Sequence, residues 1–89
     1  MKQGCRDAIK EHLKSCFLRE RKRLNLSQVG FARKLEVDVR SYIALEHGDY
    51  LCSTTTFLRF LFTCCADPVG LLEELEEIIN DGQTTESSR

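Results

Sequence analysis

Apolar residues recur along this chain at intervals of three and four, the spacing of one face of an α-helix. This pattern predicts five helices, over about 6–24, 28–35, 39–47, 54–64 and 68–80. No stretch alternates apolar and polar residues in the way of a half-buried strand. The chain is therefore expected to be all-α, with one domain over residues 1–82. Residues 83–89 contain no apolar side chain and are expected to form a disordered tail.

Local signals define the two short central helices. Ser27 and Asp38 each precede one of them, and their side chains can accept hydrogen bonds from the free N–H groups of a first helical turn. Gly48 can end the second helix in the left-handed conformation that glycine adopts at low cost. The inward positions of the pair are Phe31, Ala32, Leu35, Tyr42 and Leu45. Only a tight turn at Glu36-Val37 joins the two helices.

This ordered set resembles the helix-turn-helix of the Cro/phage-repressor (XRE-like) DNA-binding proteins. The residues that carry the resemblance are Leu26-Ser27-Gln28, Phe31-Ala32, Lys34-Leu35, Val37, Leu45-Glu46 and Gly48, with a weaker match from about Leu13 to Ala66. The resemblance implies a five-helix bundle of the lambda-repressor-like type, with the helix-turn-helix at the second and third helices. It also implies a homodimeric transcriptional regulator, of the repressor kind, that binds double-stranded DNA sequence-specifically. Two features depart from the family, which usually has glycine where Glu36 stands and a more basic segment than Asp49–Cys52.

In such proteins the second helix of the motif lies in the major groove, and its first outward side chains reach base edges. Matching this chain to the family residue by residue gives as base contacts Val39, Arg40, Ser41, Ile43 and Ala44. Arg40 could bond guanine through two donors, whereas the apolar members could only meet thymine methyl groups. The alternative is that Val39 and Ile43 form a surface for a protein partner.

Phosphate contacts are expected from a second set of residues. The resemblance assigns Gln28, at the start of the first helix of the motif, and His47, at the end of the second, to the DNA backbone. Charge alone adds Lys22, Arg23, Arg33 and Lys34. The resemblance also implies that Arg21 and Glu46 form a structural, partly buried ion pair.

Charge is divided unevenly along the chain. The net charge is −1, yet residues 1–40 carry eleven Lys and Arg against five Asp and Glu, while residues 41–89 carry two against nine. A basic half favours binding of nucleic-acid phosphates. The alternative is that both halves simply carry charges exposed to solvent, which would give the same sequence pattern.

The last helix suggests a way to dimerise. Leu72, Leu75 and Ile79 lie at coiled-coil-like spacing and could pack against a second copy. The same residues could instead fold back on the rest of the domain, and the sequence leaves both possibilities open.

The five cysteines are expected to be reduced and to act as small hydrophobes. No C-x-x-C pair occurs, which argues against a metal site. His12 and Cys16 lie one helical turn apart, but no accompanying acid or oxyanion donor is apparent, so we expect neither an enzyme nor a cofactor. Without a signal peptide or a membrane-spanning stretch, the chain is expected to be cytoplasmic. The alternative function is a protein-interaction module on the same fold, antitoxin-like or accessory, with weak or no DNA binding.

Overall fold

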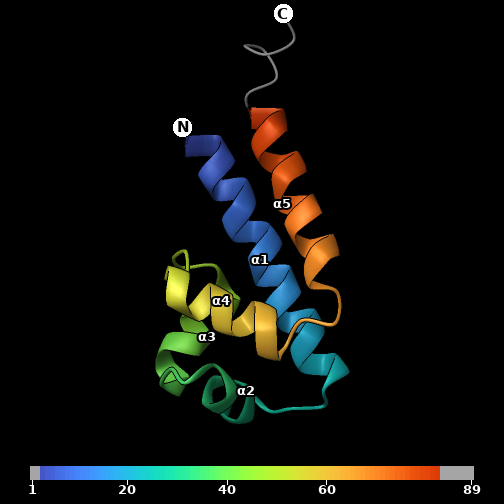
Figure 1. Cartoon of the computed structure of the whole chain (residues 1–89). Helices are drawn as coiled ribbons and strands as arrows, with labels where there is room; N and C mark the ends of the chain where they lie inside the picture. Colours follow the sequence, from blue (N-terminus) through green and yellow to red (C-terminus); the bar gives the residue numbers. More distant parts are fainter. Residues whose placement is uncertain (1–2, 83–89) are drawn as a thin grey trace, which may run out of the picture.

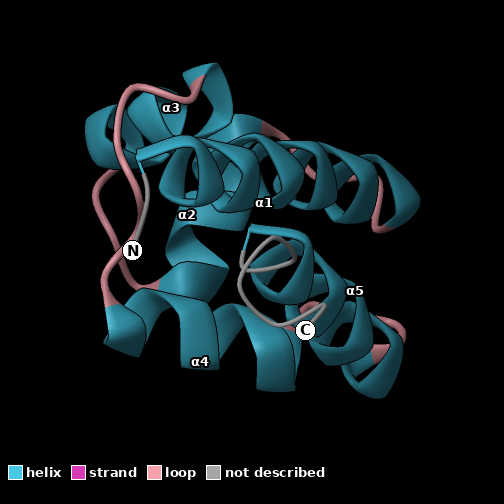
Figure 2. Ribbon diagram, turned by 90° about the horizontal axis from the view of Figure 1, so that it is seen from above, coloured by secondary structure: helices cyan, strands magenta, loops and turns pink. Residues whose placement is uncertain are grey.

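The computed structural model describes residues 3–82, and within that range the chain consists of helices and loops without a strand (Figure 2). The helices are α1 (Gln3–Arg23), α2 (Gln28–Leu35), α3 (Val39–His47), α4 (Thr54–Thr63) and α5 (Pro68–Gly82). The predicted all-α class with five helices is therefore confirmed. The expected tail over 83–89 lies outside the described residues.

The predicted ends of α2 and α3 agree with the structure, while four other boundaries need correction. α1 begins at Gln3 instead of about Arg6 and ends at Arg23 instead of about Leu24, and α4 ends one residue early, at Thr63. α5 continues through Asp81 to Gly82, so this pair does not stop the helix at Asn80 as the sequence suggested.

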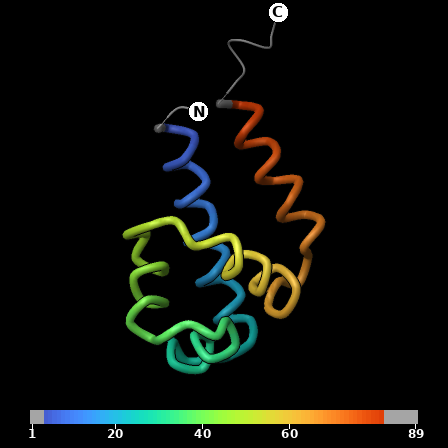
Figure 3. Tube along the Cα trace, turned by 60° about the vertical axis from the view of Figure 1, so that its left-hand side comes forward, coloured from blue at the N-terminus to red at the C-terminus, as the bar shows by residue number. Residues whose placement is uncertain are grey.

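α1 and α5 form a long pair, and the three shorter helices gather at one end of it. Figures 1 and 3 both show α5 running back alongside α1 in the opposite direction. α2, α3 and α4 surround the C-terminal half of α1, where α3 packs on α1 and α2 packs on both α3 and α4. The resulting molecule measures 46 × 24 × 20 Å along its principal axes.

The core of the short-helix end is a cluster of four aromatic rings, one from each of the first four helices. Phe17, Phe31, Tyr42 and Phe60 are each at most 2% exposed. Edge-to-face contacts join them, with ring centroids 4.8 Å apart for Phe17 and Phe60 and 5.2 Å apart for Phe31 and Tyr42. Such pairs are worth about 0.5–1.5 kcal/mol each beyond the area they bury. The predicted inward residues of α2 and α3 are all buried, as expected.

The two C-terminal helices each have one buried and one exposed apolar face. On α4, Phe60 and Leu61 are buried, but Phe62 is 75% exposed. On α5, Leu71 is buried and Leu75 packs against the core. Leu75 is half-buried against its own domain, one of the two possibilities that the sequence left open, and its part in a dimer stays a prediction. Leu72 and Ile79 are exposed.

None of the helices in residues 3–82 combines the length and the apolar character that crossing a membrane requires.

Candidate nucleic-acid interface

The first turns of α2 and α3 are capped by the side chains that the sequence indicated. Ser27 Oγ accepts a hydrogen bond from the amide of Gly30 at 3.0 Å. Asp38 accepts from Ser41 twice, through the backbone amide at 3.2 Å and through the hydroxyl at 2.6 Å. These bonds from Ser41 lower the pKa of the Asp38 carboxyl, so it is charged at neutral pH. The Ser41 hydroxyl thus serves the cap of α3.

The turn between α2 and α3 is built on Glu36 and is contacted by Arg59, a residue that the sequence did not single out. Glu36 adopts the left-handed conformation with φ of 59°, at a cost of about 1–2 kcal/mol for a residue other than glycine. The amide of Val37 closes the turn by donating to the carbonyl of Ala32 at 3.0 Å. Arg59 of α4 lies 3.7 Å from the Glu36 carboxylate and donates to the carbonyl of Leu35 at 3.5 Å. These contacts offset part of the conformational cost.

The carboxylate of Glu46, near the end of α3, accepts hydrogen bonds from residues of three helices. Arg21 of α1 donates to both carboxylate oxygens, with N···O distances of 2.5 and 3.3 Å. The amide of Gln28 in α2 donates to Oε1 at 3.0 Å, and the hydroxyl of Tyr42 donates to Oε2. Only 7% of the Glu46 side chain and 18% of the Arg21 side chain are exposed. Arg21 also donates to the carbonyl of Leu26 at 3.1 Å, so its guanidinium fastens α1, the following turn and α3 together.

Burial and hydrogen bonding act in opposite directions on the charges of this network. Burial by itself would raise the pKa of Glu46, but the bonds from Arg21, Tyr42 and Gln28 outweigh it and lower the pKa. The pKa of Tyr42 is raised, first by burial and then by its bond to the carboxylate. The bond to Glu46 raises the pKa of Arg21 despite its partial burial. The pair is therefore ionised at neutral pH, and it joins α1, α2 and α3 into one unit.

The outward face of α3 is exposed at its first turn and partly covered further along. Arg40 is exposed and Val39 is 36% exposed, whereas Ile43 and Ala44 are half-buried. Ser41 is half-buried too, and its carbonyl accepts from the hydroxyl of Tyr50 at 3.2 Å. An exposed guanidinium at the start of a helix can donate two parallel hydrogen bonds to one planar partner.

The far end of α3 rests on α1. Gly48 has φ of 79°, and a Cβ there would lie 3.0 Å from Cδ of Lys14. His47, which precedes Gly48 in the sequence, is exposed. Lys22, Arg33 and Lys34, the other predicted phosphate-binding residues, are exposed as well.

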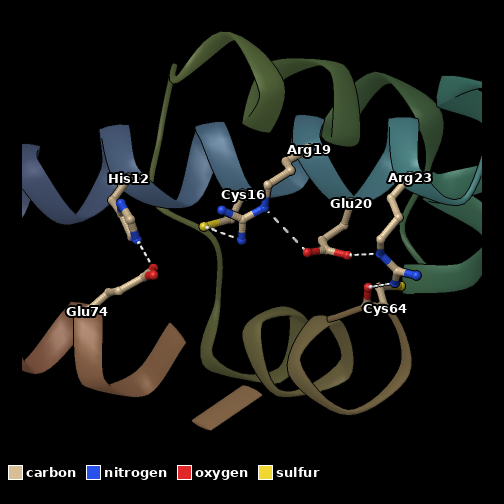
Figure 4. Close-up of polar contacts among 7 residues, drawn as sticks. All are labelled: His12, Cys16, Arg19, Glu20, Arg23, Cys64 and Glu74. Atoms are coloured by element: carbon tan, nitrogen blue, oxygen red, sulfur yellow. Dashed lines mark hydrogen bonds and ion pairs between the residues drawn. The ribbon is translucent and has the colours of Figure 1, made fainter. Parts of the chain in front are cut away.

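Arg23 belongs to a different cluster. Its Nε donates to Glu20 at 2.6 Å and its Nη2 donates to the carbonyl of Cys64 at 3.2 Å (Figure 4). Glu20, whose side chain is only 4% exposed, also lies 3.4 Å from Arg19. This buried carboxylate could not be predicted from the sequence, because nothing local distinguishes it from the exposed glutamates. Arg23 is thus engaged within the protein, at the C-terminal end of α4, although 46% of its side chain is exposed, and its phosphate contact stays a prediction.

A shallow groove lies between α2 and the beginning of α3. It is lined by Val29, Ala32, Arg33, Glu36, Val37 and Val39. Val29 is 50% exposed, so the groove offers apolar surface beside the first turn of α3.

Comparisons with models of known protein families, with curated proteins and with solved structures find no match to this chain.

Proposed function

We propose that this chain is a transcriptional regulator, of the repressor kind, that binds double-stranded DNA sequence-specifically as a homodimer. α2 and α3 would be the helix-turn-helix of a lambda-repressor-like domain in the XRE family, with α3 in the major groove. The observation that carries this proposal is the Glu46 network. It fastens α3 to α1 and α2 through buried, charge-assisted bonds and leaves the first turn of α3 facing solvent. Recognition of bases requires side chains on a rigidly positioned element, and this network would hold the exposed end of α3 rigidly.

Arg40 is the principal base-reading residue in this proposal. Its exposed guanidinium can donate to O6 and N7 of one guanine, a contact worth about 1–3 kcal/mol of discrimination. Val39, Ile43 and Ala44 can contact thymine methyl groups. The hydroxyl of Ser41 is engaged by Asp38 and adds little direct reading. The remaining selectivity would come from the shape and deformability of the DNA.

The DNA backbone would be held by groups around the two helices. The free amides at the start of α2 favour a phosphate, with Gln28 held beside them by Glu46. Lys22, Arg33, Lys34 and His47 are exposed and available for further phosphate contacts.

Homodimerisation would use the outward face of α5. Leu72 and Ile79 are 47% and 38% exposed, and Val69 nearby is 64% exposed. A dimer places two copies of α3 on successive turns of the duplex, which reading of two half-sites requires. The exposed glutamates of α5 would keep this face away from DNA.

A second function, a protein-interaction module on the same fold, is favoured by one observation. The groove beside α3 is flanked by exposed Val29 and Val39, and Arg40 is the single cation on the outward face of α3. An apolar helix of a partner would suit this surface better than a phosphate backbone does.

A salt titration tests the first function against the second. Fluorescence anisotropy with labelled random-sequence duplex, and with a duplex enriched by rounds of selection, measures affinity and preference together. The wild type should lose affinity as salt rises, with a slope of about −0.9 for each phosphate contacted. Arg40→Ala should reduce the preference for the selected duplex by about 10- to 100-fold. Gln28→Ala should weaken binding to all duplexes alike.

Arg6→Ala is the matched control, because Arg6 is an exposed cation near the start of α1. It should leave both affinity and preference close to those of the wild type. If the wild type does not bind DNA even at low salt, the regulator is refuted and the interaction module is favoured. Equal effects of Arg40→Ala and Arg6→Ala would refute the assignment of Arg40 to base reading.

A further inference from the structure

Three side chains of metal-binding type meet where α1 packs on α5, outside the α2–α3 unit. His12 and Cys16 lie one helical turn apart on α1, and Glu74 faces them from α5 (Figure 4). Their donor atoms, one imidazole nitrogen, the thiol sulfur and one carboxylate oxygen, all lie within 4.8 Å of one another. We propose that His12, Cys16 and Glu74 bind one zinc ion and thereby tie α1 to α5.

The donor set selects the metal. A thiolate and an imidazole favour borderline or soft cations, and they exclude Mg²⁺ and Ca²⁺, which prefer oxygen ligands only. One thiolate, one carboxylate and one neutral imidazole carry two negative charges, which balance the charge of Zn²⁺. Three protein ligands leave the fourth tetrahedral position for a water molecule.

Binding requires donor atoms that lie up to 4.8 Å apart to approach one another by about 1 Å and the closest pair to separate. In a tetrahedral zinc site neighbouring donor atoms lie about 3.3–3.8 Å apart. His12 Nε2 and Glu74 Oε1 are 2.7 Å apart, so the ion would replace this hydrogen bond and separate the two atoms by about 0.6 Å or more. The Glu74 side chain is 48% exposed and the His12 side chain 29% exposed, so both can adjust. Cys16 is fully buried and provides the fixed point of the site.

The surroundings of Cys16 are compatible with a bound cation. Burial raises the pKa of the Cys16 thiol, and the charge of Arg19, whose Nη2 lies 3.6 Å from Sγ, opposes this only in part. The charge of Arg19 is itself opposed by buried Glu20, whose carboxylate lies 3.4 Å from Nε. On binding, the S–H bond of Cys16 breaks, an S–Zn bond forms, and the proton passes to solvent. Arg19 is long and its side chain is 56% exposed, so it can swing away from the sulfur.

Isothermal titration of the reduced full-length chain with Zn²⁺ tests the site, with Co²⁺ as a spectroscopic probe. We expect one ion per chain and a thiolate-to-cobalt charge-transfer band in the near ultraviolet. His12→Ala, Cys16→Ser and Glu74→Ala should each weaken Zn²⁺ binding by about 100-fold or more, because loss of a direct ligand exceeds the usual effect of its supporting residues. Cys16→Ser should also abolish the charge-transfer band.

Two variants serve as matched controls. Cys52→Ser removes a half-buried thiol that is outside the cluster, and Glu76→Ala removes an exposed carboxylate from α5. Both should bind Zn²⁺ and Co²⁺ like the wild type. Because Cys16 is fully buried, its variant could unfold, and Glu74→Ala then provides the decisive comparison, with helicity monitored by circular dichroism. Absence of stoichiometric binding by the wild type, or equal affinities of Glu74→Ala and Glu76→Ala, would overturn the proposal.

Discussion

Replacing Glu46 with alanine tests whether the buried network holds α3 against α1 and α2. The change removes the acceptor of the bonds from Arg21, Gln28 and Tyr42 and leaves the guanidinium mostly out of water without a partner. Breaking a buried ion pair on one side costs about 3–5 kcal/mol. With Arg21 still 18% exposed, we expect the lower end, about 3 kcal/mol. A domain of this size is stable by only about 5–10 kcal/mol, so much of its stability would be lost.

Urea denaturation followed by far-ultraviolet circular dichroism measures this loss. Arg21→Ala should cost a similar amount, and the double variant should cost about 2 kcal/mol less than the sum of the two single variants, because the partners are coupled. Glu76→Ala, an exposed carboxylate of α5, is the control and should change the free energy of unfolding by about 0.5 kcal/mol at most. A cost for Glu46→Ala as small as that of the control, or additive effects of Arg21 and Glu46, would refute the reasoning.

Three further predictions concern pH, the end of α3 and dimerisation. Because the folded-state pKa of Glu46 is lowered, its charge contributes stability that is complete above the unfolded pKa of about 4.3 and is lost as the pH falls through the folded value. Glu46→Gln should therefore flatten the decline of the urea midpoint below about pH 4.5, and an unchanged decline would contradict this. Gly48→Ala should cost about 1–2 kcal/mol in urea unfolding, since φ is 79°, and Gly48→Asn should cost less; equal costs would contradict a conformational origin. Leu72→Glu should turn the proposed dimer into a helical monomer by analytical ultracentrifugation, whereas Glu76→Ala should not; a wild type that is already monomeric would refute dimerisation through α5.

The parts of the fold that the sequence predicted well depend on local chemistry. Ser27, Asp38 and Gly48 act on the first or last turn of their own helix, so their effect can be read from a few neighbouring residues. The inward stripes of α2 and α3 follow from helical periodicity in the same way. The end of α5 was misjudged because Asp81-Gly82 is a helix-ending signal only where no other interaction favours continued helix.

The parts that sequence reasoning missed depend on pairs distant along the chain. Glu20 is buried among residues of a helix whose other glutamate, Glu11, is exposed, and only the fold shows why. Arg59 reaches the α2–α3 turn from α4, and Glu74 reaches His12 across 62 positions. The spacing of His12 and Cys16 was visible in the sequence, but the third ligand of the proposed metal site was not. The periodicity of a sequence shows on which face of its helix a residue lies. It does not show which other helix packs against that face.

The aromatic cluster has a consequence for how the α2–α3 unit can be used. The rings of Phe31 and Tyr42 contact each other, and each also contacts a ring outside the segment, Phe60 of α4 for Phe31 and Phe17 of α1 for Tyr42. The segment 26–48 therefore shares its core with α1 and α4, and cut out of the chain it would expose one side of two large rings to water. Transplanting the exposed face of α3 into another protein would mean moving four helices together. If the proposed regulator is right, its specificity would be changed more easily by replacing exposed residues of α3, such as Arg40, than by moving the motif.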